Sequence, residues 1–201
     1  MGLTWGESSL VTDIHPSFFD WPSCAFLPTL AETDRWEESI KFEAEVKELP
    51  ERYVACIRHV GPYPKIGGAI MKILEWGKAK SLIEFPQTAL LAVYHDNPSV
   101  VEEAKLRSDA CITVPEGTEV DGEVHTMRIP GGLFAVAHVE IDQDEYGKAW
   151  DKLIDEWIPK SGYEPDYPSN RLCYELYLND PEKHPQKKHL VDICEPVRKG
   201  G

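Results

Sequence analysis

The 201-residue sequence has no apolar run approaching the roughly 18 residues of a membrane helix, and its N-terminus lacks a basic region followed by an apolar one. We therefore expect no membrane span and a cytoplasmic location. Basic residues are also scarce, because 21 Lys and Arg stand against 35 Asp and Glu, giving a formal net charge of −14. Nucleic acids and anionic membranes need a basic protein face, so neither is expected as a direct partner.

Motifs for disulfide, metal or phosphate chemistry are missing as well. The five cysteines are odd in number and form no C-x-x-C pair, which predicts neither a disulfide framework nor a zinc knuckle. His184 and His189 have no acidic or thiol ligand at a fixed spacing. No glycine-rich phosphate loop or G-x-S-x-G elbow occurs. The sequence thus predicts no metal and no cofactor.

The chain does contain an internal sequence repeat with two copies. Trp76 and Trp157 lie 81 residues apart, and four further pairs lie 83 apart: Tyr94 and Tyr177, Pro98 and Pro181, Asp109 and Asp192, Cys111 and Cys194. Two copies are too few for a solenoid. We expect one closed, pseudosymmetric domain over residues 41–201 with a cleft at the join, its repeats covering about residues 41–115 and 123–198.

Each copy predicts the order strand, helix, strand, strand. The first copy contains an opening alternating strand and then elements at 53–60, 65–79 (helix), 90–95 and 110–114. The second contains elements at 133–141, a helix capped by Asp144 and terminated by Pro159 and Gly162, and strands at 172–178 and 190–195.

The predicted fold class is therefore α+β. The duplicated β-α-β-β units should form a curved, largely antiparallel sheet with one helix per copy on its outer side and a central cleft. Residues 1–40 combine proline and aromatic residues without a regular period, and they predict an irregular N-terminal extension.

The strand at 172–178 carries the most informative residue, Glu175. Side chains alternate along a strand, so Glu175 shares a face with Tyr177, and we expect the leucine-rich face to meet the helix. The 83-residue offset places Ala92 and Tyr94 at the equivalent positions of the first copy. A carboxylate between aromatic walls favours binding of an organic cation. The alternative is that Glu175 pairs with a local Arg or Lys, or faces solvent.

Other aromatic residues are weaker candidates for the cleft wall. Tyr63, Trp76 and Phe134 are included as ligand-binding candidates, although Gly-Pro-Tyr is also a good turn and a tryptophan near a helix end is more often core. Trp150 and Trp157 follow a helical apolar stripe, which favours a core position.

Five segments in the right order resemble the GyrI-like effector-binding domains over about residues 41–198: Tyr53–Tyr63, Leu106–Val114, Ile129–Val136, Glu156–Tyr163 and Glu175–Pro181. The resemblance implies a duplicated fold with a central cleft for amphipathic, often cationic molecules. It also implies that the glutamate of the E-x-Y-x-N-D-P motif, Glu175 here, faces the ligand, with Tyr177 as a wall residue. The second copy departs from the family's H-x-G-P-Y-like turn, because Val139–Gln143 replaces it.

Three functions remain open at this point. The first is a stand-alone binder of small amphipathic cations that acts as a sensor, a sequestering agent or a resistance protein. The second, implied by the resemblance, is a hydrolase that opens cyclopropane rings with Glu175 and Tyr177 as catalytic residues. The third, also implied by the resemblance, is binding to DNA gyrase. The sequence leaves the oligomeric state open.

Overall fold

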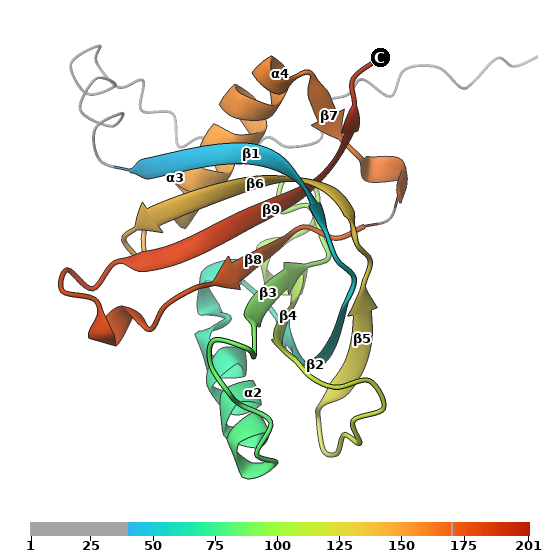
Figure 1. The fold of residues 1–201 in the computed structure, drawn as a ribbon, viewed down its shortest axis with the longest axis vertical. Coiled ribbons are helices and arrows are strands. Elements are labelled where there is room, and N and C mark those ends of the chain that lie inside the picture. The colour runs from blue at the N-terminus through green and yellow to red at the C-terminus, as the bar shows by residue number, and fades with distance from the viewer. Residues whose placement is uncertain (1–39, 170) are drawn as a thin grey trace, which may run out of the picture.

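The computed structural model describes residues 40–169 and 171–201, which form a curled sheet flanked by two helical segments (Figure 1). The predicted N-terminal extension lies outside the described residues except for Ile40. Within the described part, nine strands belong to the sheet: β1 (Lys41–Leu49), β2 (Arg52–Val60), β3 (Leu90–Tyr94), β4 (Arg107–Thr113), β5 (His125–Ile129), β6 (Gly132–Ile141), β7 (Tyr163–Pro165), β8 (Tyr174–Tyr177) and β9 (His189–Lys199).

The strand order confirms the duplicated, pseudosymmetric α+β fold. It runs β1-β6-β9-β8-β3-β4-β2-β5, so β8 and β3 meet at the centre and the two halves repeat the same order outward; β7 pairs with β9 off this path. All the strand pairs are antiparallel. At the central pair, Ala92 lies opposite Glu175, and these two residues are 83 positions apart. The pseudo-twofold axis therefore passes between Ala92 and Glu175.

The edge strand in each half of the sheet comes from the other repeat of the sequence. β1 pairs with β6 rather than with the following β2, and β5 pairs with β2 rather than with β6. The β1–β2 connection and the β5–β6 connection cross at Gly131. A Cβ added to Gly131 would lie 2.6 Å from the Leu49 carbonyl oxygen and 2.7 Å from the Glu51 nitrogen. Only glycine fits this crossing without displacing backbone, because real Cβ atoms essentially never approach so closely.

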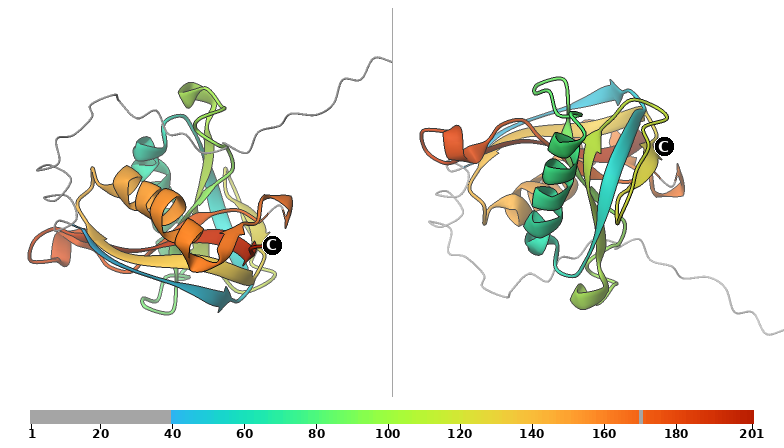
Figure 2. Two further views of the ribbon diagram at one scale, coloured as in Figure 1. Left: turned by 90° about the horizontal axis from the view of Figure 1, so that it is seen from above. Right: turned by 90° about the horizontal axis from the view of Figure 1, so that it is seen from below.

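Both helical segments lie on one face of the sheet (Figure 2). They are α2 (Gly67–Ala79) and a segment made of α3 (Tyr146–Asp151), a π-helical stretch (Lys152–Trp157) and α4 (Ile158–Ser161). Ile66, Ala69 and Ile73 of the first segment pack on Ala92, Ala110 and Ile112. Ala149 and Leu153 of the second pack on Ala137, Val191 and Ile193. Each helix thus buries its apolar stripe on its own half of the sheet.

The prediction that the leucine-rich face of 172–178 meets a helix is wrong. Leu172, Tyr174 and Leu176 instead belong to a core on the opposite face of the sheet, together with residues of β2 to β6 and β9. There the rings of Tyr174 and Phe134 lie 5.5 Å apart. The curl of the sheet brings its own strands together over that face, so both faces are covered. Glu175 and Tyr177 consequently lie on the helix side.

Other elements differ in detail from the prediction. The short strands β5 and β7 were not predicted, and β5 is the second-copy equivalent of β1 in strand order. Asp144 does not cap α3; the N-cap position is Glu145, without a side-chain cap hydrogen bond. None of the helices in the described residues has the length and apolar character needed to cross a membrane.

Candidate functional site

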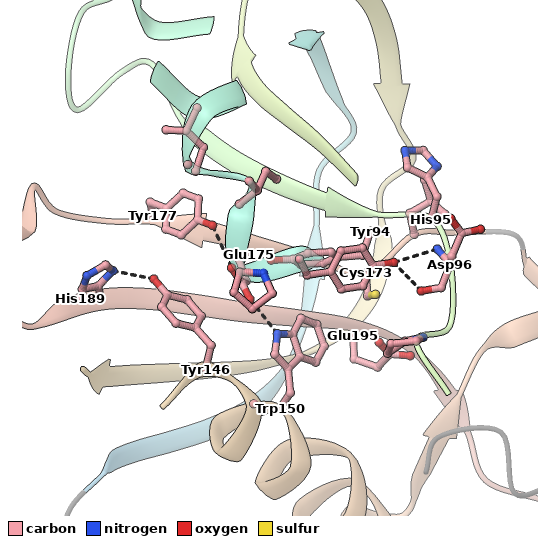
Figure 3. A pocket seen from close by; sticks show the side chains of 18 of the residues that line it. Tyr94, His95, Asp96, Tyr146, Trp150, Cys173, Glu175, Tyr177, His189 and Glu195 are labelled. Carbon is pink, nitrogen blue, oxygen red and sulfur yellow. Dashed lines mark hydrogen bonds between the residues drawn. The ribbon is translucent and has the colours of Figure 1, made fainter. Parts of the chain in front are cut away.

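A pocket of about 1000 Å³ lies over the central strands, between the two helical segments (Figure 3). Its walls come from the lead-in and first turns of α2, the end of β3 and the following loop, α3, the segment before β8, β8 itself, and two positions of β9. The wall surface is mainly apolar, and the pseudo-twofold axis enters it at Glu175. The predicted central cleft is therefore present.

Glu175 lies at the base of this pocket with 3% of its surface exposed. Its Oε1 accepts a hydrogen bond from Trp150 Nε1 at 2.8 Å, and its Oε2 accepts one from the Tyr177 hydroxyl at 2.9 Å. No Lys, Arg or His of the described residues forms an ion pair with it. Two neutral donors thus orient the carboxyl group, and no internal cation in the described chain neutralises it.

The pKa of Glu175 is raised, chiefly because burial disfavours the charged form, while hydrogen bonds from the indole and the tyrosine hydroxyls act in the opposite direction. Burial also raises the pKa values of Tyr94 and Tyr177, and the nearby Glu175 carboxylate raises them further. The tyrosines therefore stay neutral hydrogen-bond donors.

An aromatic wall surrounds the carboxyl group. The rings of Tyr63 and Tyr94 lie 4.7 Å apart and tilted, and Tyr94 meets Trp150 edge-on at 6.1 Å. The Tyr63 hydroxyl donates to the Asp96 carbonyl oxygen at 2.6 Å, which fixes the first ring of the series. The π-electron faces of such rings attract cations.

The two ends of the pocket differ in chemistry. At one end Tyr146 and His189 are joined by a 2.7 Å hydrogen bond, and burial lowers the pKa of His189. At the other end lie Cys173 and Glu195 (Figure 3). Arg171 also lines that end, but its guanidinium is bound to Asp166 at 2.7 Å and to the Leu133 carbonyl oxygen at 2.9 Å.

Comparison with known proteins decides the family. The model of the GyrI-like small molecule binding domain matches residues 42–198. The chain belongs to this family. It is 37% identical over 135 residues to DNA gyrase inhibitor 2 of Dickeya dadantii, covering 65% of this chain and 82% of that protein. It is 31% identical over 143 residues to the DNA gyrase inhibitor of Escherichia coli, covering 68% and 85%.

Solved structures share the fold of this GyrI-like domain. The EcmrR C-terminal domain has a TM-score of 0.63 at 22% identity, over 79% of this chain and 99% of that one. The chain spans 58% of EcmrR in its complex with DNA, with a TM-score of 0.65 at 20% identity. SAV2435 bound to tetraphenylphosphonium has a TM-score of 0.52 at 11% identity, over 78% of this chain and 94% of that one.

Four of the seven residues predicted from the sequence line the pocket of this GyrI-like domain: Glu175, Tyr177, Tyr94 and Tyr63. The other three do not. Ala92 is fully buried beneath α2, opposite Glu175. Trp76 packs outside the pocket, where its Nε1 donates to Asp121 Oδ1 at 2.7 Å. Phe134 is buried on the opposite face of the sheet, because Gly132 to Ile141 alternate and its neighbours Leu133 and Ala135 face the helix side.

Trp150 and Glu195 are among the pocket residues that the sequence did not predict. Trp150 was placed in the core because it follows the apolar stripe of α3, yet a buried indole N–H needs an acceptor, and that need was the available signal. Glu195 follows Ile193 and precedes Val197 on one face of β9. An acid alternating with apolar residues on a buried strand face was the signal for it.

Proposed function

We propose that this GyrI-like domain binds amphipathic organic cations in the pocket, with Glu175 as the counter-charge and the aromatic side chains as walls. The observation that carries the proposal is the Glu175 carboxyl group itself. It is 3% exposed, lines a pocket of about 1000 Å³, and forms no ion pair with a described residue.

The energetics favour a cation over a neutral ligand. An ionised carboxylate in an apolar site is costly unless it is paired. Trp150 and Tyr177 donate hydrogen bonds to it but bring no charge. A cation about 5 Å away at an effective dielectric constant near 20 gains about 3 kcal/mol of Coulomb energy. The surrounding rings add cation–π attraction of about 0.5 to 2 kcal/mol.

The pocket rim supports the same ligand class. Asp144 lies at the rim and is exposed, and the whole chain carries a net charge of −14. Among the described residues, one guanidinium lies at the wall, that of Arg171, and it is already bound to Asp166. The local potential therefore attracts cations and opposes anions.

Calorimetric titration with tetraphenylphosphonium, the molecule bound to SAV2435, tests the proposal. Triphenylphosphine oxide serves as a neutral ligand of similar shape. We expect Glu175→Gln to weaken phosphonium binding by about 10- to 100-fold, after allowance for solvent screening of the Coulomb energy. Binding of the neutral oxide should change by less than about 3-fold, since it gains no Coulomb energy from the carboxylate.

Glu48→Gln is the matched control, because Glu48 is exposed on β1 and is not among the residues that line the pocket. Equal phosphonium affinity in the parent and in Glu175→Gln refutes the proposal. The parent protein and Glu175→Gln should also be incubated with a cyclopropane-containing substrate. Ring opening by the parent and not by Glu175→Gln would favour the hydrolase alternative, while recovery of unchanged substrate would favour binding alone.

Binding to DNA gyrase is a second candidate, favoured by the names of the relatives at 31 to 37% identity. The test is inhibition of supercoiling by purified gyrase at low salt, with bovine serum albumin as the control protein. Absence of inhibition at a large molar excess, together with no capture of gyrase, rejects this candidate.

A further inference from the structure

A second acid lies in the same pocket. Glu195 is 4% exposed and lines the pocket, and its Oε2 has no hydrogen-bond partner. It forms no ion pair with a described residue, and the guanidinium of Arg171 in the pocket wall is paired with Asp166. A buried polar atom without a partner costs about 1 to 3 kcal/mol, so this position needs an explanation.

The position of Glu195 relative to Glu175 follows from the strand register. Glu175 of β8 pairs with Ile193 of β9, and Glu195 is two residues further along β9 on the same face. Diagonal neighbours of this kind lie about 7 Å apart. Figure 3 shows Glu195 beyond Trp150 and Cys173, away from the Tyr146 and His189 end.

Packing alone does not require an acid there. The 83-residue offset relates Glu195 to Ile112 in the first half, and Ile112 is fully buried in the core beneath α2. An apolar side chain therefore fills the equivalent site of the same fold. The two buried acids of the pocket, Glu175 and Glu195, both lie in the second half, where the first half has Ala92 and Ile112.

We infer that Glu195 forms a second subsite of the pocket, and that the preferred ligands are elongated molecules with two basic nitrogens, one held at Glu175 and the other at Glu195. The inference rests on the proposed function, since it takes Glu175 as the first cation site. Each ammonium group gains a charge-assisted hydrogen bond, and the unpartnered oxygen of Glu195 gains a donor.

The protonation state of Glu195 predicts that a proton is released when the second ammonium group binds. Burial raises its pKa to about 8, with a hydrogen bond from Cys173 acting in the opposite direction. The other titratable or charged groups around this end include Tyr167 with the nearby Asp155, Arg171 with its partner Asp166, and Glu175. The free protein therefore holds this carboxyl group largely protonated at neutral pH. Binding of a second ammonium group ionises it, and the proton leaves to the buffer.

The test compares 1,5-bis(aminomethyl)naphthalene with 1-(aminomethyl)naphthalene, which share the ring system and differ by one ammonium group. Affinities are measured calorimetrically for the parent, Glu195→Gln, Glu175→Gln and the control Glu48→Gln, in two buffers of different ionisation enthalpy. In the parent the diamine should bind about 10-fold or more tightly than the monoamine and release close to one proton. Glu195→Gln should abolish both differences while leaving monoamine affinity within about 2-fold.

The outcomes separate the two claims. If the parent binds both amines equally and Glu175→Gln weakens both, the second subsite is wrong and the cation site at Glu175 stands. If the diamine keeps its advantage in Glu195→Gln, the second subsite is also wrong. If neither amine binds and tetraphenylphosphonium does not bind either, both proposals are overturned.

Discussion

Replacing Glu195 by glutamine should change how stability depends on pH. The folded-state pKa of Glu195 is about 8, against an ordinary value of 4.5, because the group is buried. The folded protein therefore binds this proton more tightly than the unfolded chain does. Below pH 4.5 both states are protonated and no penalty exists. As pH rises toward 8 the unfolded chain gains by ionising, so the stability of the parent falls.

The size of the effect follows from the same two pKa values. The cost to stability of keeping Glu195 protonated is about 1 kcal/mol at pH 5.5 and about 4 kcal/mol at pH 7.5, so the parent should lose roughly 2 to 3 kcal/mol between them through this group. Glu195→Gln cannot ionise and should not show this loss. Any effect of the substitution on packing is the same at both pH values and cancels from the difference.

Urea unfolding of the parent, Glu195→Gln and the exposed-site control Glu48→Gln, each at pH 5.5 and 7.5, measures the difference. Groups such as Asp109, whose pKa is lowered to about 2 by His95 and Arg58 against the effect of burial, contribute equally to all three proteins. Unfolding free energies of parent and Glu195→Gln that stay offset by a constant, within about 0.5 kcal/mol, would falsify the reasoning that this acid is neutral in the fold.

Two further predictions concern the crossing and the indole donor. Gly131→Ala should lower the free energy of unfolding by about 1 to 3 kcal/mol, because its methyl group would collide with the backbone at Leu49 and Glu51. The control Gly68→Ala in α2 places its methyl group in open space and should be neutral or stabilising. Equal urea midpoints for the two variants would contradict this prediction. Trp150→Phe removes the donor to Glu175 Oε1, so it should lower the free energy of unfolding by about 1.5 to 3 kcal/mol when Glu175 is ionised and by less once Glu175 is protonated. An equal loss of stability at pH 4 and pH 8 would argue against that hydrogen bond.

The fold class was predictable because the internal repeat and the strand periodicities can both be read directly from the sequence. The offset of 83 residues made Ala92 the equivalent of Glu175, and these two residues lie opposite each other in the central antiparallel pair. The exchange of edge strands was not predictable, since β1 is followed directly by β2 and reads as half of a hairpin. Which strands pair over long range depends on how the whole sheet curls, and the sequences of β1 and β2 contain no information about that curl.

The site was predicted where chemistry alone was enough. Glu175 stands out because an acid in an apolar strand is expensive, and Tyr177 follows from alternation. Phe134 was misassigned because an aromatic side chain on a strand fits either face, and the apolar face of 172–178 was expected to meet a helix. In a curled sheet both faces are buried, so apolarity does not tell the pocket side from the closed core.

The location of Glu175 explains why the two halves differ. Antiparallel pairing of β3 and β8 places equivalent residues of the two copies directly opposite each other at the axis. An acid in both copies would put two buried carboxylates face to face, and like charges in such cross-strand pairs are destabilising. A single acid opposite Ala92 avoids that repulsion. Glu195 lies off the axis in the same half, so this second buried acid breaks the pseudosymmetry of the pocket on one side only.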